Sequence, residues 1–305
     1  MKNFSFVLFV LFLLCPVCVT LGKTLPDQFN NKDVRGWIIL SDDMNAAIQT
    51  IKAAKEYDIN QLQLSHEIIH DLREIKTEKV CAQVNELVNL AHSEEINEVL
   101  LWDHSLYDID YYPERFRTGP GGTIDLDNTE FWEWLKDDYR QMLDRVSEAD
   151  GLVLTFIETG AYAERQFSKK MKSSEEKLAA VVNAISDVLI GERKKKLYIR
   201  TFAYSEEEYK GTTGCIEYLK YDEVILMMKE TPHDFFLTHP DNYYIQKMDR
   251  PVIVEFDLGN EYSGQGVVAN TWPEHVMKRW NSYIHCPNVT GYVARTDRYG
   301  NTSIV

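Results

Sequence analysis

Short apolar runs with strand character alternate with segments of helical period along the chain. The strand-like runs span residues 34–40, 59–64, 99–102, 151–157, 197–204, 223–228, 251–256 and 290–295. Apolar side chains recur at helical spacing in residues 44–56, 78–91, 130–146, 173–189 and 272–284, and a short helix is expected at 215–219. Strands that alternate with helices predict parallel βαβ units, and eight such strands predict closure into a single-domain (β/α)8 TIM barrel.

An open, doubly wound α/β sheet is the alternative, but no glycine-rich phosphate loop follows the first strand. The long polar segment 103–128 lacks a clear period, and loops of this length in compact domains are usually functional. The 305 residues accommodate one barrel, which we assign to residues 23–305. Because the sequence ends shortly after the eighth strand, either a short tail closes the barrel without its last helix or the sequence is part of a longer protein.

Residues 1–22 have the pattern of a secretory signal peptide. Lys2 supplies the positive end, residues 4–14 form a short apolar run, and small residues precede position 23. The run is too short for a membrane span. Lipid anchoring is less favoured, because the residues before Cys15 and Cys18 are not small. We therefore expect a secreted or periplasmic protein without an integral membrane span.

Net charge and cysteine content exclude several classes of partner. The formal charge of -15 argues against the phosphate backbone of a nucleic acid. After the signal segment, Cys81, Cys215 and Cys286 are too sparse for a disulfide framework and too widely spaced for a metal site. We expect no cofactor and no metal.

Three carboxylates follow three predicted strands: Glu158 after the fourth, Asp234 after the sixth and Glu261 after the seventh. Groups just past the carboxyl ends of the strands form the active sites of such barrels, and glycoside hydrolysis uses carboxylates. Apolar neighbours of Glu158 predict a raised pKa, which suits a general acid, although an exposed loop carboxylate is the alternative. Asp234 and Glu261 are candidates for activating a water, or for a turn cap and a surface residue.

Charged residues also occur within or at the ends of three predicted strands. Strand alternation directs Glu255 inward, where a carboxylate needs a partner. Arg200 and Lys229, at the ends of the fifth and sixth strands, either supply that partner or hold an anionic substrate.

His66 and His70 fit the HExxH pattern of zinc proteases. That site requires both histidines on one helical face and a third ligand, for which Glu86 is a weak candidate. Because the pattern begins where the second strand ends, we expect a loop there, with His66 lining the site and no metal bound.

Four segments together resemble the catalytic barrel of family 67 α-glucuronidases, in order and in approximate spacing. They are Ile157-Glu158-Thr159-Gly160, residues 198–204 (YIRTFAY), residues 229–235 (KETPHDF) and residues 255–265 (EFDLGNEYSGQ). The flanking domains of that family are missing, and Leu154 stands where the family has a lysine that helps to bind the uronate.

This resemblance implies an inverting hydrolase acting on a polysaccharide or oligosaccharide that contains uronic acid. Glu158 would be the general acid, and Asp234 with Glu261 would position and deprotonate water. Arg200 and Lys229 would hold the carboxylate of the sugar. The full set of expected substrate contacts is Arg200, Lys229, Glu255, Tyr262, Trp102 and His66. The alternative from another class is a non-catalytic, carbohydrate-binding barrel.

Overall fold

A computed structural model of the chain describes residues 32–259, 261, 262 and 272–296. The described residues from Asp33 onward belong to one compact unit. The predicted signal peptide at residues 1–22 lies outside the described residues, as do residues 263–265 of the last family-like segment.

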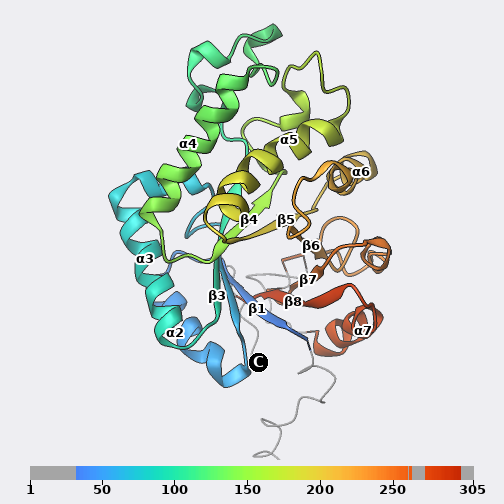
Figure 1. The fold of residues 1–305 in the computed structure, drawn as a ribbon. Helices are drawn as coiled ribbons and strands as arrows, with labels where there is room; N and C mark the ends of the chain where they lie inside the picture. Colours follow the sequence, from blue (N-terminus) through green and yellow to red (C-terminus); the bar gives the residue numbers. More distant parts are fainter. Residues whose placement is uncertain (1–31, 260, 263–271, 297–305) are drawn as a thin grey trace, which may run out of the picture. The chain divides into compact units, whose positions relative to one another are not determined.

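Eight parallel strands pair in chain order and close into a barrel, with β8 beside β1 (Figure 1). The strands are β1 (Val34–Ile39), β2 (Gln61–Leu64), β3 (Glu98–His104), β4 (Gly151–Thr155), β5 (Lys196–Arg200), β6 (Ile225–Lys229), β7 (Val252–Asp257) and β8 (Val289–Arg295). The (β/α)8 barrel predicted from the alternating pattern is therefore confirmed.

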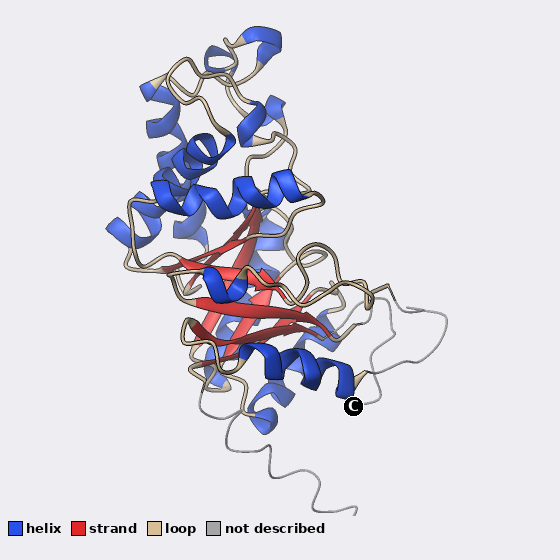
Figure 2. Cartoon of the chain, turned by 90° about the vertical axis from the view of Figure 1, so that its right-hand side faces the viewer, coloured by secondary structure: helices blue, strands red, loops and turns tan. Residues whose placement is uncertain are grey.

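Helices surround the strands on the outside of the barrel (Figures 1 and 2). They are α2 (Met44–Ala54), α3 (Glu78–Ser93), α4 (Thr129–Arg145), α5 (Ser174–Ser186), α6 (Glu206–Gly214) and α7 (Pro273–Tyr283). Polar residues fix where they begin. The Asp43 carboxylate accepts from two backbone amides at the start of α2, and Ser173 forms a capping box with Glu176 at the start of α5.

The sequence pattern missed α6, because the only helix predicted in this region was a short one at residues 215–219. In the structure α6 covers residues 206–214, and a 3-10 turn, η9 (Cys215–Tyr218), follows it. The hydroxyl of Ser205 accepts from the Glu208 amide, 3.2 Å away, and three glutamates occupy the first turn. A cap and a favourable helix dipole thus define this helix, whereas its apolar stripe is weak.

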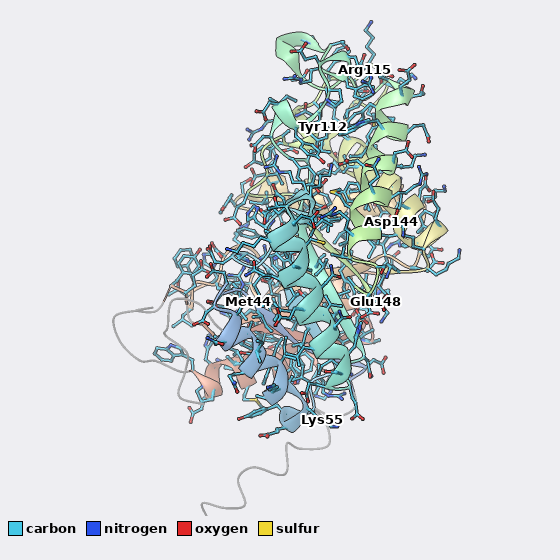
Figure 3. All side chains as sticks on the ribbon, turned by 90° about the vertical axis from the view of Figure 1, so that its left-hand side faces the viewer. Met44, Lys55, Tyr112, Arg115, Asp144 and Glu148 are labelled. Carbon is cyan, nitrogen blue, oxygen red and sulfur yellow. The ribbon has the colours of Figure 1, made fainter. Side chains whose placement is uncertain are left out.

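The connection between β3 and α4, predicted as a long irregular loop, contains three short 3-10 turns: η4 (Ile109–Tyr111), η5 (Glu114–Phe116) and η6 (Pro120–Gly122). Figure 3 shows Tyr112 and Arg115 of this connection at the opposite end of α4 from Asp144. The ring of Tyr112 packs against Phe131 and Trp134 of α4, with centroids 5.9 and 5.7 Å apart. Aromatic contacts therefore anchor the connection to α4.

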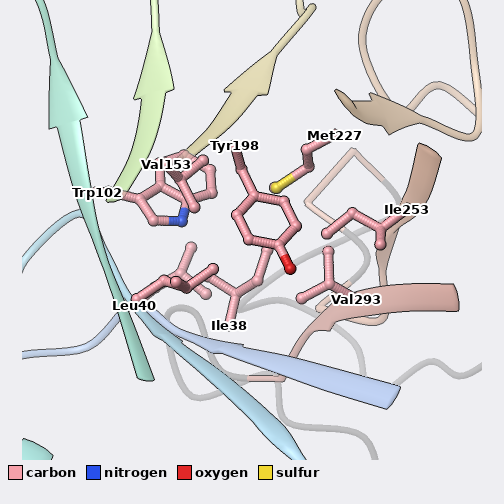
Figure 4. Packing of buried hydrophobic residues seen from close by; sticks show 9 residues of the cluster. Ile38, Leu40, Trp102, Val153, Tyr198, Met227, Ile253 and Val293 are labelled. Atoms are coloured by element: carbon pink, nitrogen blue, oxygen red, sulfur yellow. The ribbon is translucent and has the colours of Figure 1, made fainter. Parts of the chain in front are cut away.

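The inside of the barrel is layered. Figure 4 shows a central layer of apolar side chains from alternating strand positions: Trp102, Val153, Tyr198, Met227, Ile253 and Val293, with Ile38 and Leu40. Side chains two residues apart on a strand point to the same face, so the next inward position on five strands lies closer to their carboxyl ends. Those positions hold His104, Arg200, Lys229, Glu255 and Arg295. A charged layer, Arg200, Lys229, Glu255 and Arg295, thus covers the apolar core below the site.

Candidate active site at the carboxyl end of the barrel

A polar pocket of 530 Å³ opens where the strands end. Its walls come from the segments that follow β2, β4 and β7, so it occupies the position at which barrels of this fold carry their chemistry. We call it the mouth pocket, and its lining residues are His66, Glu67, His70, Glu74, Glu158 and Glu261. Two of the three predicted catalytic carboxylates therefore share one pocket.

Glu158 follows β4 in an exposed turn with a positive φ of 62°. The hydroxyl of Tyr204 donates to its Oε1, at 3.0 Å. Burial is the largest effect and raises the pKa of the Glu158 carboxyl, but the charge of Arg200, the Tyr204 hydrogen bond and smaller effects that include Lys229 together outweigh it, and the pKa is lowered overall. The expected effect of apolar surroundings is therefore present, but the overall direction is opposite to the predicted one. Glu158 is ionised in the free pocket at neutral pH.

Asp234 lies in the segment that follows β6, and each oxygen of its carboxylate accepts a hydrogen bond. Lys229 donates to Oδ1 at 2.7 Å, and the hydroxyl of Tyr262 donates to Oδ2. Burial raises the pKa of Asp234, but Lys229 and the two hydrogen bonds lower it overall. Asp234 is therefore an oriented, ionised carboxylate.

Two tyrosines connect the three carboxylates. Burial and the charges of Glu158 and Asp234 raise the pKa of Tyr204. Burial, the hydrogen bond to Asp234 and the charge of Glu261 raise the pKa of Tyr262. The charges of Glu158 and Asp234 thus act on Tyr204, and those of Asp234 and Glu261 act on Tyr262.

Lys229 is almost fully buried, with 3% of the side chain exposed. Its ammonium lies 3.5 Å from the centroid of the Phe202 ring and 4.2 Å from that of Phe235. Burial, together with the charges of Arg200 and Arg295, lowers its pKa to about 7. Lys229 is directed at Asp234, and the aromatic rings separate much of its charge from the solvent.

Arg200 and Glu255 form a buried, two-point ion pair. The Nε–Oε2 distance is 2.6 Å and the Nη2–Oε1 distance is 3.0 Å, and the side chains are 1% and 0% exposed. The prediction that Arg200 and Glu255 contact a substrate directly is corrected, because their polar atoms bind each other beneath the pocket. The other predicted role of Arg200, as the partner of Glu255, describes this geometry.

Sequence reasoning missed Arg295. It lies at the end of β8, donates from Nε to Glu255 at 3.2 Å and from Nη1 to Oε2 of Glu261 at 2.7 Å. Arg295 thus joins the charged layer to a carboxylate of the mouth pocket. Its inward position, two residues after Val293, was the available signal.

Trp102 is fully buried, so its predicted contact with a substrate is also corrected. Its Nε1 donates to Oε1 of Gln63 at 2.8 Å, and the Arg200 guanidinium lies 4.8 Å from its ring centroid. His66, whose ring centroid lies 5.2 Å from that of Trp102, lines the mouth pocket as expected. Trp102 supports the site from below.

A cluster of His70, Asp71 and His104 borders the pocket and was not predicted. His66 and His70 lie in the loop after β2, so the helix that an HExxH zinc site requires is not formed. The ligand atoms of His70, Asp71 and His104 come within 4.8 Å of one another. However, the two imidazoles are stacked, with centroids 3.6 Å apart and planes 9° apart. Lone pairs in two parallel ring planes do not converge on a single ion, so this geometry does not suit a metal.

Exposed aromatic rings lie beside the carboxylates. Tyr204, Tyr262 and Phe236 are 55%, 41% and 44% exposed, and the rings of Phe236 and Tyr262 are 4.3 Å apart. Because hydroxyl bonds hold both tyrosines to carboxylates, their ring faces are fixed at the rim. Flat apolar surfaces of this kind suit the apolar faces of sugar rings.

No protein-family model matches the chain, and no curated protein matches it by sequence. Solved structures of glycoside hydrolases share its fold. The structure of CpGH84B matches with a TM-score of 0.56 at 12% identity, covering 87% of this chain and 45% of that one. A GH138 enzyme targeting pectin rhamnogalacturonan II matches with a TM-score of 0.54 at 11% identity, covering 87% of this chain and 35% of that one. The chain spans less than half of either structure, and the likeness establishes a barrel fold of the kind found in glycoside hydrolases.

Proposed function

We propose that this chain is a glycoside hydrolase whose chemistry is carried by Glu158, Asp234 and Glu261. The supporting observation is that Glu158 and Glu261 line one pocket at the carboxyl end of the barrel, while Lys229 and Tyr262 orient Asp234 beside it. The exposed aromatic rim and the fold shared with glycoside hydrolases agree with a carbohydrate ligand.

The proposed reaction is inverting hydrolysis. Asp234, ionised and fixed by two hydrogen bonds, accepts a proton from the attacking water, and Glu261 helps to orient that water. Glu158, which accepts from the hydroxyl of Tyr204, serves the departing oxygen. Because Glu158 is ionised in the free pocket, its proton must be supplied before or during substrate binding.

The proposed substrate is a polysaccharide or oligosaccharide that contains uronic acid. This specificity is supported by the family resemblance and by the three cations of the charged layer, Arg200, Lys229 and Arg295. Each cation already contacts a carboxylate: Glu255, Asp234 and Glu261 respectively. The carboxylate of a uronate would therefore be attracted by the positive potential of these paired cations, without a direct contact to a free one. Because this attraction acts only on charged sugars, neutral glycosides are the necessary comparison in any assay.

The test is hydrolysis of matched uronosides and neutral glycosides, with the anomeric product followed by NMR. Turnover that Asp234→Asn abolishes and Asp222→Asn leaves unchanged would support the proposal. Asp222, which precedes β6, is a suitable control. Its carboxylate is fully exposed, and in the described part of the chain it pairs with Arg250 alone. Affinity for glycans without turnover would instead favour a non-catalytic carbohydrate-binding barrel.

We also propose that the protein is secreted, on the signal-like pattern of residues 1–22. Among the residues that the structure describes, no helix is both long and apolar enough to cross a membrane.

A further inference from the structure

His70 is a pocket residue to which the proposed reaction has given no task. Its ring lines the mouth pocket together with Glu158, and 40% of its side chain is exposed. Its Nδ1 lies 2.9 Å from Oδ1 of Asp71, whose other oxygen is 2.9 Å from Nη2 of Arg73. An ionised carboxylate accepts, so Nδ1 carries a hydrogen and Nε2 is the nitrogen left for the pocket.

A second contact fixes the plane of the same ring. The imidazole of His70 stacks on that of His104, and Nδ1 of His104 donates to the backbone oxygen of His70 at 2.6 Å. Burial, followed by the charge of His70, lowers the pKa of His104 to about 4, so His104 is neutral at physiological pH. His104 thus fixes the orientation of the His70 ring, and Asp71 fixes its tautomer. A histidine held in this way is prepared for proton transfer.

The charges that face His70 come from three parts of the barrel. Its own segment supplies Asp71, Glu74 and Arg73, the end of β3 supplies His104, and the end of β4 supplies Glu158. The Asp71 hydrogen bond raises the pKa of His70, burial opposes it, and the charges of Asp71, Glu74 and Glu158 add to the increase. The pKa of Glu158, in contrast, is lowered. In the free pocket, one proton therefore resides on His70 rather than on Glu158.

We propose that His70 is a further catalytic residue, electrostatically coupled to Glu158 across the pocket they share, and that it supplies the proton of the acid step, with Asp71 and His104 as positioning residues. This inference rests on the proposed glycosidase function for its chemical purpose. The geometry behind it does not depend on the substrate, since it consists of the shared pocket, the Asp71 contact and the stacked ring.

The proposed step balances. The proton held by His70 passes to the glycosidic oxygen, the bond from that oxygen to the anomeric carbon breaks, and its electron pair leaves with the aglycone. Water forms the new bond to the carbon and gives its proton to Asp234. Asp234 then releases this proton to solvent, and His70 takes up another, so that no further reactant is needed. Because the charges of His70 and Glu158 act on each other, the pH profile reflects both groups.

The first experiment follows the imidazole of His70 by NMR as a function of pH and needs no substrate. In Glu158→Gln the pKa of His70 should fall by up to ~1 unit, because a nearby negative charge is removed. Asp222→Asn should leave it unchanged. An unaltered His70 titration in Glu158→Gln would overturn the coupling, even if the protein hydrolyses glycosides.

The second experiment measures kcat and KM against pH on a glycoside with a poor leaving group. His70→Gln should lower kcat by roughly 10²-fold at pH 7 and by less at pH 5, with little change in KM. Asp71→Asn keeps an oxygen for Nδ1 but removes the charge, so it should move the basic limb to lower pH while the fold is retained. The matched control is His92→Gln, which removes another His–Asp contact, that of His92 with Asp150 at 2.9 Å, far from the strand ends that form the pocket.

The outcomes separate the two proposals. If the parent protein turns over no glycoside while the NMR coupling is present, the proposed function fails and the coupling of His70 to Glu158 stands. If the parent protein is active and both His70→Gln and Asp71→Asn keep its pH profile, His70 has no catalytic role. Loss of activity in His92→Gln equal to that in His70→Gln would also overturn the proposal, since the effect would then be structural.

Discussion

Arg200 and Glu255 bind each other through two nitrogens and two oxygens inside the barrel, on strands β5 and β7 that are not neighbours in the sheet. The pair lies inside the barrel and joins the two strands on either side of β6. Arg295 adds a third contact to the same carboxylate. The pair compensates two buried charges below the site, so removing either side chain is expected to lower the free energy of unfolding.

We predict that Arg200→Ala lowers the free energy of unfolding by about 3–5 kcal/mol, because it leaves the Glu255 charge buried without its main partner. Urea denaturation provides the measurement. The exposed pair Lys210–Glu206, at 3.6 Å, is the control, and Lys210→Ala should cost less than about 1 kcal/mol through that pair. If the two substitutions lower the free energy of unfolding equally, the buried pair does not stabilise the fold more than an exposed pair does.

Much of this fold follows from local pattern. Alternating strands and helices predicted the barrel, and strand ends pointed to Glu158, Asp234 and Glu261. Inward alternation identified Glu255 as a buried carboxylate, but two candidate partners remained, because residues 55 positions apart are brought together only by closure of the barrel. The same limitation left Arg295 unassigned.

Other features had no local signal. The stack of His70 on His104 joins two strand ends, and the third strand was predicted to stop at residue 102, before His104. The predicted pKa of Glu158 was wrong because it considered the neighbours in the sequence. The groups that reverse the effect of burial, Arg200 first among them, come from other strands and their loops. Charge arrangement across strands, rather than apolar pattern, sets the chemistry of this site.

Tyr262→Phe should shift the acidic limb of the kcat/KM profile to higher pH. The hydroxyl of Tyr262 helps to lower the pKa of Asp234, after the larger effect of Lys229, so its loss raises that pKa. A base works above its pKa, and activity should therefore fall at a higher pH than in the parent protein. The control is Tyr57→Phe, a half-exposed tyrosine at the end of a turn after α2. An acidic limb that does not move would argue against Asp234 as the base.

Glu230 predicts a pH dependence of stability. Burial raises its pKa to about 7, although Arg279 lies 3.1 Å away and opposes the shift. The folded pKa is above the unfolded value of about 4.3, so the contribution of this group is fully present below pH ~4 and is lost as pH rises through 7.

Glu230→Gln removes that dependence. Whatever constant offset the substitution adds, the free energy of unfolding of the variant relative to the parent should increase between pH 5 and pH 8, by on the order of 2 kcal/mol. Urea denaturation at several pH values measures it, and the exposed residue Glu217 supplies the control substitution Glu217→Gln. A difference that is constant with pH would show that Glu230 is ionised throughout.

Glu158→Gln tests the acid side of the reaction. An acid matters most when the leaving group is poor, so kcat on a natural glycoside should fall by roughly 10²–10⁴-fold. An aryl glycoside with an acidic phenol departs without protonation, and its kcat should fall much less. Asp234→Asn should impair both substrates, because water must be activated in either case. Tyr204→Phe, which removes the hydroxyl bond to Glu158 but keeps the carboxylate, should raise the pKa of Glu158 and cost less than Glu158→Gln on both substrates. Equal losses on the natural and the aryl glycoside in Glu158→Gln would show that Glu158 acts on the water or the sugar instead of the departing oxygen.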